Sequence, residues 1–132
     1  MVVATHGRAP LLTRLVDALE RQESAPSFEV ILVDDGSPDD TWSTIERLEQ
    51  TARVTVRGVR LARQSGPAAA RNAGWRATSS PRIVFTDDDC VPQPGWLRTL
   101  ADGLEEADIA QGVTRPDPAQ HAPRAVDRLH PR

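Results

Sequence analysis

The segment Arg82-Ile83-Val84-Phe85-Thr86-Asp87-Asp88-Asp89 runs from an apolar stretch directly into three consecutive carboxylates. A short run of branched and aromatic residues is typical of a buried β-strand. Carboxylates crowded at the end of a strand repel one another, which costs stability unless positive charge lies among them. Ligands of open α/β sheets bind at that same edge. A hard divalent cation carrying phosphate oxygens would meet both conditions, and a solvated acidic turn is the ordinary alternative.

Strand-like and helix-like segments alternate along the chain on both sides of this stretch. We expect strands at residues 2–4, 28–33, 54–61, 83–85 and 108–113, and helices at residues 8–22, from 38 onward, 68–77 and 94–105. Ser37 is the expected N-cap of the second helix, and Gly58 is a candidate kink in the third strand. Strands that alternate with helices require crossover connections. The pattern therefore predicts a three-layer α/β/α fold with a mainly parallel, Rossmann-like sheet.

Length and composition limit the possibilities further. The chain has 132 residues, a formal net charge of −3 and one cysteine, Cys90. One domain with one modest core fits this length, and the charge excludes the basic face expected of a nucleic-acid-binding protein. A single cysteine excludes an internal disulfide, which favours a cytoplasmic setting. No apolar stretch approaches the ~20 residues of a membrane span.

The last part of the chain differs in composition from the rest. Residues 1–114 carry the alternating pattern, whereas residues 115–132 are polar and punctuated by prolines. Such a segment buries too little apolar surface to offset its ordering entropy. We therefore expect one domain over residues 1–114, followed by a mobile tail.

Polar residues follow three of the predicted strands at the point where each strand ends. The clusters are Thr5-His6-Gly7-Arg8, Asp34-Asp35-Gly36-Ser37 and Asp87-Asp88-Asp89. The carboxyl ends of parallel strands lie along one edge of a sheet, so the three clusters should converge on one cleft. Taken singly, each has an ordinary explanation as a turn, a helix cap or a surface loop. Three coincidences on one edge favour a binding site.

A fourth candidate element is the helix start Gly66-Pro67-Ala68-Ala69-Ala70-Arg71-Asn72. Small residues and free N–H groups at a helix N-terminus suit an anion. Arg71 could pair with a phosphate or with one of the clustered aspartates, and the residues alone leave both open. Nucleophile elbows, dinucleotide fingerprints and P-loops are absent from the sequence, which argues against those chemistries.

The ordered set of motifs resembles the inverting family 2 glycosyltransferases of the GT-A fold. The segments that carry the resemblance are Ala4-Thr5-His6-Gly7-Arg8, Val33-Asp34-Asp35-Gly36-Ser37, Gly66 to Gly74 and Phe85-Thr86-Asp87-Asp88-Asp89. Order and spacing match over residues 2–114. The resemblance implies a nucleotide-sugar donor, such as a UDP-sugar, an unidentified acceptor and a divalent cation, Mg2+ or Mn2+.

The resemblance also implies roles for single residues. Ala4 and His6 would border the nucleobase. Asp35 would accept a hydrogen bond from the base, and Asp34 would support that loop. Asp87, Asp88 and Asp89 match the family's Asp-x-Asp motif, with the middle aspartate near the ribose, Asp89 on the metal and Asp87 as a second metal ligand. Arg71 completes the predicted nucleotide site.

The family's catalytic base comes well beyond the Asp-x-Asp motif, so we expect it beyond Arg132. The sequence thus predicts a donor-binding region that is truncated at its C-terminus and incomplete for catalysis. We expect the protein to be cytoplasmic, either free or at the membrane surface. Two alternatives stay open. One is a non-catalytic module that binds nucleotides or nucleotide sugars. The other, a nucleotidyltransferase, lacks support because no glycine-rich, lysine-bearing phosphate loop occurs near the start.

Overall fold

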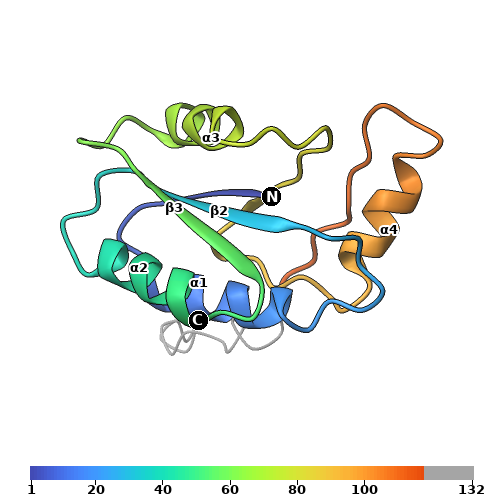
Figure 1. Ribbon diagram of the computed structural model, residues 1–132, viewed down its shortest axis with the longest axis horizontal. Coiled ribbons are helices and arrows are strands. Elements are labelled where there is room, and N and C mark those ends of the chain that lie inside the picture. The colour runs from blue at the N-terminus through green and yellow to red at the C-terminus, as the bar shows by residue number, and fades with distance from the viewer. Residues whose placement is uncertain (118–132) are drawn as a thin grey trace, which may run out of the picture.

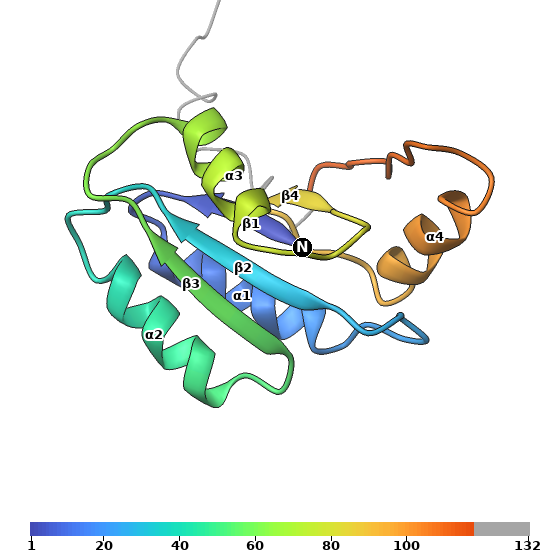
Figure 2. The same cartoon turned by 45° about the horizontal axis from the view of Figure 1, so that its top comes forward.

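A computed structural model describes residues 1–117, in which strands and helices alternate. The elements are β1 (Val2–Thr5), α1 (Ala9–Leu19), β2 (Glu29–Asp34), α2 (Thr41–Thr51), β3 (Thr55–Arg60), α3 (Pro67–Arg76), β4 (Phe85–Asp87) and α4 (Trp96–Gly103). The four strands of this part of the chain are parallel and lie in the order β3-β2-β1-β4 (Figure 1; all four strands are labelled in Figure 2). This order brings the carboxyl ends of β1, β2 and β4 together.

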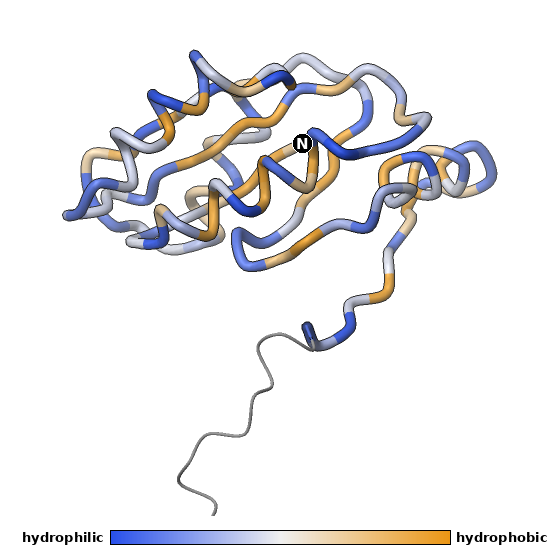
Figure 3. The backbone as a smooth tube through the Cα atoms, turned by 90° about the horizontal axis from the view of Figure 1, so that it is seen from below, coloured by the Kyte–Doolittle hydropathy of each residue, from blue (hydrophilic) through white to orange (hydrophobic). Residues whose placement is uncertain are grey.

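Helices cover both faces of the sheet, with α1 and α2 on one face and α3 on the other (Figure 2). Successive strand residues point to opposite faces, so Val3 packs in the cluster with Leu12 and Leu15 of α1. Its neighbour Val2 packs in the cluster with Ala70 of α3. Hydrophobic and hydrophilic residues alternate along the helices, as expected when one helix face lies on a sheet (Figure 3). The predicted α/β/α fold with a parallel sheet is confirmed.

The helix α2 begins later than the sequence predicts, at Thr41 rather than at Pro38. The expected cap, Ser37, uses its hydroxyl elsewhere, because Oγ accepts a hydrogen bond from the backbone N–H of Gly7 at 2.9 Å. The side chain of Asp39 then accepts hydrogen bonds from the hydroxyl and the backbone N–H of Thr41, at 2.6 and 3.1 Å. Such local side-chain bonds compete with helix formation. These hydrogen bonds from Thr41 also lower the pKa of the Asp39 carboxyl.

The strand β3 runs through Gly58, where a kink was a possibility. Its residues pair one to one with β2 from Thr55 to Arg60. The glycine has a packing role instead, because a Cβ built on it would lie 2.7 Å from Cγ2 of Ile45 and 3.0 Å from the ring of Trp42. The absence of a side chain at Gly58 therefore lets α2 lie close to the sheet.

The strand β4 is shorter and less buried than predicted. It lies next to β1 only, and Phe85 is 48% exposed. The predicted strand at residues 108–113 does not form, and Ile109 and Val113 are each 84% exposed. Because no further strand covers the outer edge of β4 among residues 1–117, the prediction of a buried strand is wrong at Phe85. The structure therefore places the acidic segment at an edge of the sheet.

The predicted tail lies largely outside the described residues, which end at position 117. Within residues 1–117, no helix is both long enough and apolar enough to cross a membrane.

Candidate functional site

A cavity of about 380 Å3 opens at the carboxyl edge of the sheet. Loops after β1, β2 and β4 and the start of α3 line it. The predicted site residues that lie in its wall are Ala4, His6, Asp35, Arg71, Asp87, Asp88 and Asp89. Thr5, Arg8, Gln64 and Pro67 also line the cavity and were not among the predicted site residues. The predicted convergence of the three polar clusters on one cleft is therefore observed, whereas the roles of the single residues remain predictions.

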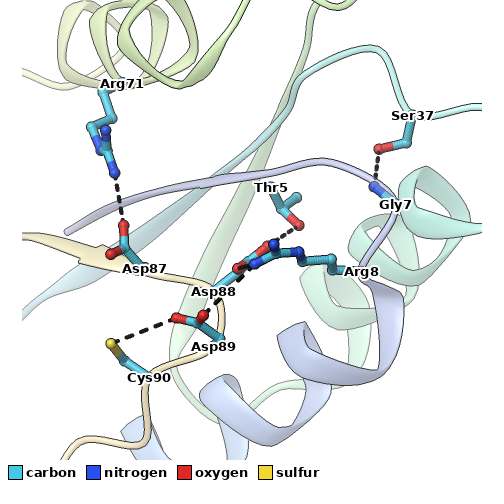
Figure 4. Close-up of polar contacts among 9 residues, drawn as sticks. All are labelled: Thr5, Gly7, Arg8, Ser37, Arg71, Asp87, Asp88, Asp89 and Cys90. Carbon is cyan, nitrogen blue, oxygen red and sulfur yellow. Dashed lines mark hydrogen bonds and ion pairs between the residues drawn. The ribbon is translucent and has the colours of Figure 1, made fainter. Parts of the chain in front are cut away.

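Asp88, the middle aspartate, is held in place by Thr5 of β1 and by Arg8. It is 5% exposed, and its Oδ2 accepts a hydrogen bond from the Thr5 hydroxyl at 2.7 Å. Its Oδ1 accepts a hydrogen bond from the guanidinium of Arg8 at 3.0 Å (Figure 4). Both oxygens thus have a partner within the protein, and a contact with a ribose would have to use their remaining lone pairs.

The two outer aspartates are exposed on the cavity. Oδ1 of Asp87 accepts a hydrogen bond from Arg71 of α3 at 2.7 Å. Oδ2 of Asp89 lies 3.7 Å from the guanidinium of Arg8, a looser ion pair. Two arginines therefore stand among the three carboxylates. The protein therefore supplies part of the positive charge that the sequence predicts among the carboxylates.

Asp35 joins the end of β2 to the start of α3. Its Oδ1 accepts a hydrogen bond from the backbone N–H of Ser65 at 2.7 Å, and its Oδ2 accepts one from Gly66 at 2.8 Å. Gly66 has a φ of +92°, a conformation that favours glycine. The carboxylate is 4% exposed. Asp35 thus fixes the helix start that presents Arg71, in addition to lining the cavity.

Asp34 lies behind the cavity wall and does not line it. It is fully buried, and its Oδ1 accepts a hydrogen bond from the backbone N–H of Ser37 at 2.9 Å. Its Oδ2 has no hydrogen-bond partner within residues 1–117 but faces Nε of Arg60 at 3.4 Å. The guanidinium of Arg60 in turn lies 5.5 Å from the centre of the Trp42 ring. The predicted role of Asp34 in supporting the nucleotide-binding loop stays a prediction.

His6 connects the first two polar loops. Its Nδ1 lies 2.9 Å from the backbone carbonyl oxygen of Asp35. A carbonyl oxygen can only accept, so this hydrogen bond requires a proton on Nδ1. The ring borders the cavity beside Ala4. Loop 5–8 therefore has a defined position relative to Asp35.

The carboxylate oxygens in the cavity fit a divalent cation that binds together with phosphate oxygens. Among the described residues, no three histidine, cysteine or acidic side chains gather to hold a metal by themselves. Mg2+ bound with nucleotides commonly uses one or two carboxylates and completes its shell with phosphates and water. Asp87 and Asp89, with side chains 62% and 54% exposed in the same cavity, offer such carboxylates.

A parallel sheet with an acidic cleft at its carboxyl edge defines an α/β protein suited to bind a polar ligand there. The comparison with known families is specific. The model of Glycosyl transferase family 2 matches residues 1–125, and the chain belongs to this family. The resemblance seen in the sequence motifs is thereby confirmed.

Individual relatives agree with this assignment. Uncharacterized glycosyltransferase YwdF of Bacillus subtilis (strain 168) is 32% identical over 109 residues, which cover 83% of this chain and 39% of the relative. The structure of S. aureus TarS 1-349 in complex with UDP superposes with a TM-score of 0.70 at 27% identity, covering 80% of this chain and 31% of TarS. Mannosyltransferase PcManGT from Pyrobaculum calidifontis, in complex with GDP-Man and Mn2+, gives 0.68 at 30% identity, covering 79% and 30%. The chain thus spans less than two fifths of the length of these proteins.

Proposed function

We propose that the chain is the donor-binding region of a family 2 glycosyltransferase, which binds a nucleotide sugar with the help of a divalent cation. The observation that carries the proposal is the convergence of the loop after β1, Asp35, Arg71 and the Asp87–Asp89 turn on one cavity of about 380 Å3. The bound UDP of TarS and the GDP-Man and Mn2+ of PcManGT support it.

The residues divide into a base end and a phosphate end. Ala4 and His6 would border the nucleobase, and Asp35 would accept a hydrogen bond from it through a lone pair that Ser65 and Gly66 leave available. Arg71 lies at the other end, where it would exchange part of its contact with Asp87 for a phosphate oxygen. Asp88 would lie near the ribose.

Asp89 and Asp87 would hold the cation at the phosphate end. A cation there supplies positive charge for the diphosphate that leaves when the sugar is transferred. The protein's own contribution is to keep these carboxylates in place through the Asp88 contacts with Thr5 and Arg8.

Transfer with inversion also requires a general base for the acceptor hydroxyl. We assign this base to none of residues 1–117. The chain by itself should accordingly bind a donor with its cation and transfer the sugar poorly. The acceptor is left open.

Titration calorimetry with UDP, UDP-sugars and GDP-Man, each in Mn2+ and in EDTA, tests the proposal. We expect binding of at least one nucleotide that is tighter in Mn2+. A folded chain that takes up none of them would contradict the proposal. An assay of the purified chain for sugar transfer and donor hydrolysis then distinguishes the two candidates: slow turnover is expected of the enzyme, and none of the alternative, a non-catalytic binding module.

A further inference from the structure

Arg8 reaches from the first helix to the acidic turn, and it makes none of the proposed contacts with the donor itself. It is the residue before α1, and its carbonyl accepts hydrogen bonds from the N–H groups of Leu11 and Leu12. Its backbone is thus fixed by the first turn of the helix. Its guanidinium crosses to the end of β4 and lies between Asp88 and Asp89 (Figure 4).

The two contacts of this guanidinium differ in strength. The contact with Asp88 is a 3.0 Å hydrogen bond to a carboxylate that is 5% exposed. A buried charge that loses its partner is strongly destabilising, so this contact should be kept. The contact with Asp89 is 3.7 Å long, and both side chains are about half exposed. Exposed ion pairs of this kind contribute little and are readily exchanged.

We propose that Arg8 is the resident counter-ion of the acidic turn: it keeps Asp88 in place and gives up Asp89 when a divalent cation binds. It is a positioning residue, since it acts through the two aspartates. This inference rests on the proposed function, because the cation is the one that would accompany the donor.

The charge balance of the turn gives the inference a measurable consequence. Asp87, Asp88 and Asp89 carry three negative charges, and Arg8 and Arg71 carry two positive ones. A metal ion without nucleotide meets a site with a net charge of only −1 and a guanidinium next to Asp89. Removal of the Arg8 charge should therefore raise the affinity for the metal alone.

The test is a titration of Mn2+ without nucleotide, with the free ion measured by electron paramagnetic resonance. We expect Arg8→Gln to bind Mn2+ on the order of tenfold more tightly than the native chain, from the loss of one charge at contact distance. In EDTA the same variant should melt about 5 °C or more below the native chain, because Asp88 has lost its partner. The control is Arg98→Gln, which removes an exposed arginine paired with Asp102 on α4 and should change neither value.

An Arg8→Gln chain with native Mn2+ affinity overturns the inference. If that variant does not fold in EDTA, the double change Arg8→Gln with Asp88→Asn should restore folding, since the uncompensated buried charge is then gone. A double variant that stays unfolded also overturns it. These measurements contain no nucleotide, so a failure of the native chain to bind UDP would overturn the donor site while the Mn2+ comparison still decides the role of Arg8.

Discussion

Asp35 and Gly66 lie thirty-one positions apart in the chain, yet the backbone N–H of Gly66 donates a 2.8 Å hydrogen bond to Oδ2 of Asp35. The neighbouring N–H of Ser65 donates to the other oxygen. The carboxylate at the end of β2 therefore determines where α3 begins. Because α3 carries Arg71, this single side chain couples the loop after β2 to the position of Arg71 in the cavity wall.

The change Asp35→Asn should disturb this coupling. An amide has one acceptor oxygen, so its NH2 group would face one of the two N–H donors, and that partly buried hydrogen bond to a carboxylate would be lost. We expect the free energy of unfolding to fall by about 1–3 kcal/mol in urea denaturation. The change Asp17→Asn, at an exposed position on α1, is the matched control and should be neutral. Equal stability of the two variants would contradict the coupling.

Glycine 58 gives a prediction about packing between α2 and the sheet. The change Gly58→Ala places a Cβ 2.7 Å from Ile45, so the helix must move outward, and we expect a loss of about 1–3 kcal/mol in unfolding free energy. The control is Gly95→Ala, where the new Cβ would meet nothing within 4 Å. If both changes have the same effect, Gly58 has no packing role.

The sequence was sufficient to predict the layers and the polar edge of the sheet. Apolar runs such as 28–33 end in acidic turns, and parallel strands place those turns together whatever the details of packing. Among the cavity-lining residues, His6, Asp35 and Asp87 to Asp89 follow from this rule, whereas Arg71 was indicated by the helix start and Ala4 by the family resemblance. Asp34 is the exception, because it is the last residue of β2, is fully buried and uses Oδ1 to accept a hydrogen bond from the backbone N–H of Ser37.

The contacts that hold the site could not be predicted in the same way. The donors to Asp35 are backbone N–H groups, which every residue except proline has, so no residue type marks them. Arg8 lies eighty positions from Asp88, and any of several arginines could have served as its partner. The exposure of Phe85 depends on what lies beside β4 and not on the apolar run that contains it. The only feature of the sequence that pointed to Arg8 as a site residue was its place in the first polar cluster, Thr5-His6-Gly7-Arg8.

The contact between Glu20 and Arg53 should make the free energy of unfolding depend on pH. The backbone N–H of Arg53 donates to Oε1 of Glu20 at 2.6 Å, and this bond, helped by the Arg53 guanidinium, lowers the pKa of the Glu20 carboxyl. A carboxyl whose pKa is lower in the folded state stabilises the fold above its unfolded pKa, and this contribution is lost as the pH falls through the folded pKa.

The stability difference between the native chain and Glu20→Gln should therefore be largest near neutral pH. It should shrink below the ordinary pKa range of glutamate, as followed by urea denaturation at a series of pH values. The exposed Glu46→Gln change serves as the control. A difference that stays constant down to strongly acidic pH would show that ionisation of Glu20 is not involved.

Asp89 provides the most direct test of the metal assignment. It is about half exposed, so Asp89→Asn should leave the melting temperature unchanged. In calorimetry with UDP, this change should abolish most of the gain in affinity that Mn2+ gives, and binding in EDTA should stay as in the native chain. The Asp17→Asn variant should retain the full gain. An undiminished Mn2+ effect in Asp89→Asn would remove Asp89 from the metal site.

Arg71 distinguishes recognition of the phosphates from recognition of the base. Its guanidinium lies 2.7 Å from Asp87, where we propose that the phosphates bind, and hydrogen bonds between ions are stronger than those between neutral groups. The change Arg71→Gln should weaken UDP binding about tenfold, or about 1.4 kcal/mol, because one charged contact with phosphate is lost. Uridine has no phosphate, so its weaker binding should not change. The control Arg76→Gln removes an arginine on the same helix that lies over the ring of Trp75, and it should affect neither ligand. If Arg71→Gln weakens uridine as much as UDP, the arginine acts through the shape of the cavity and not on the phosphates.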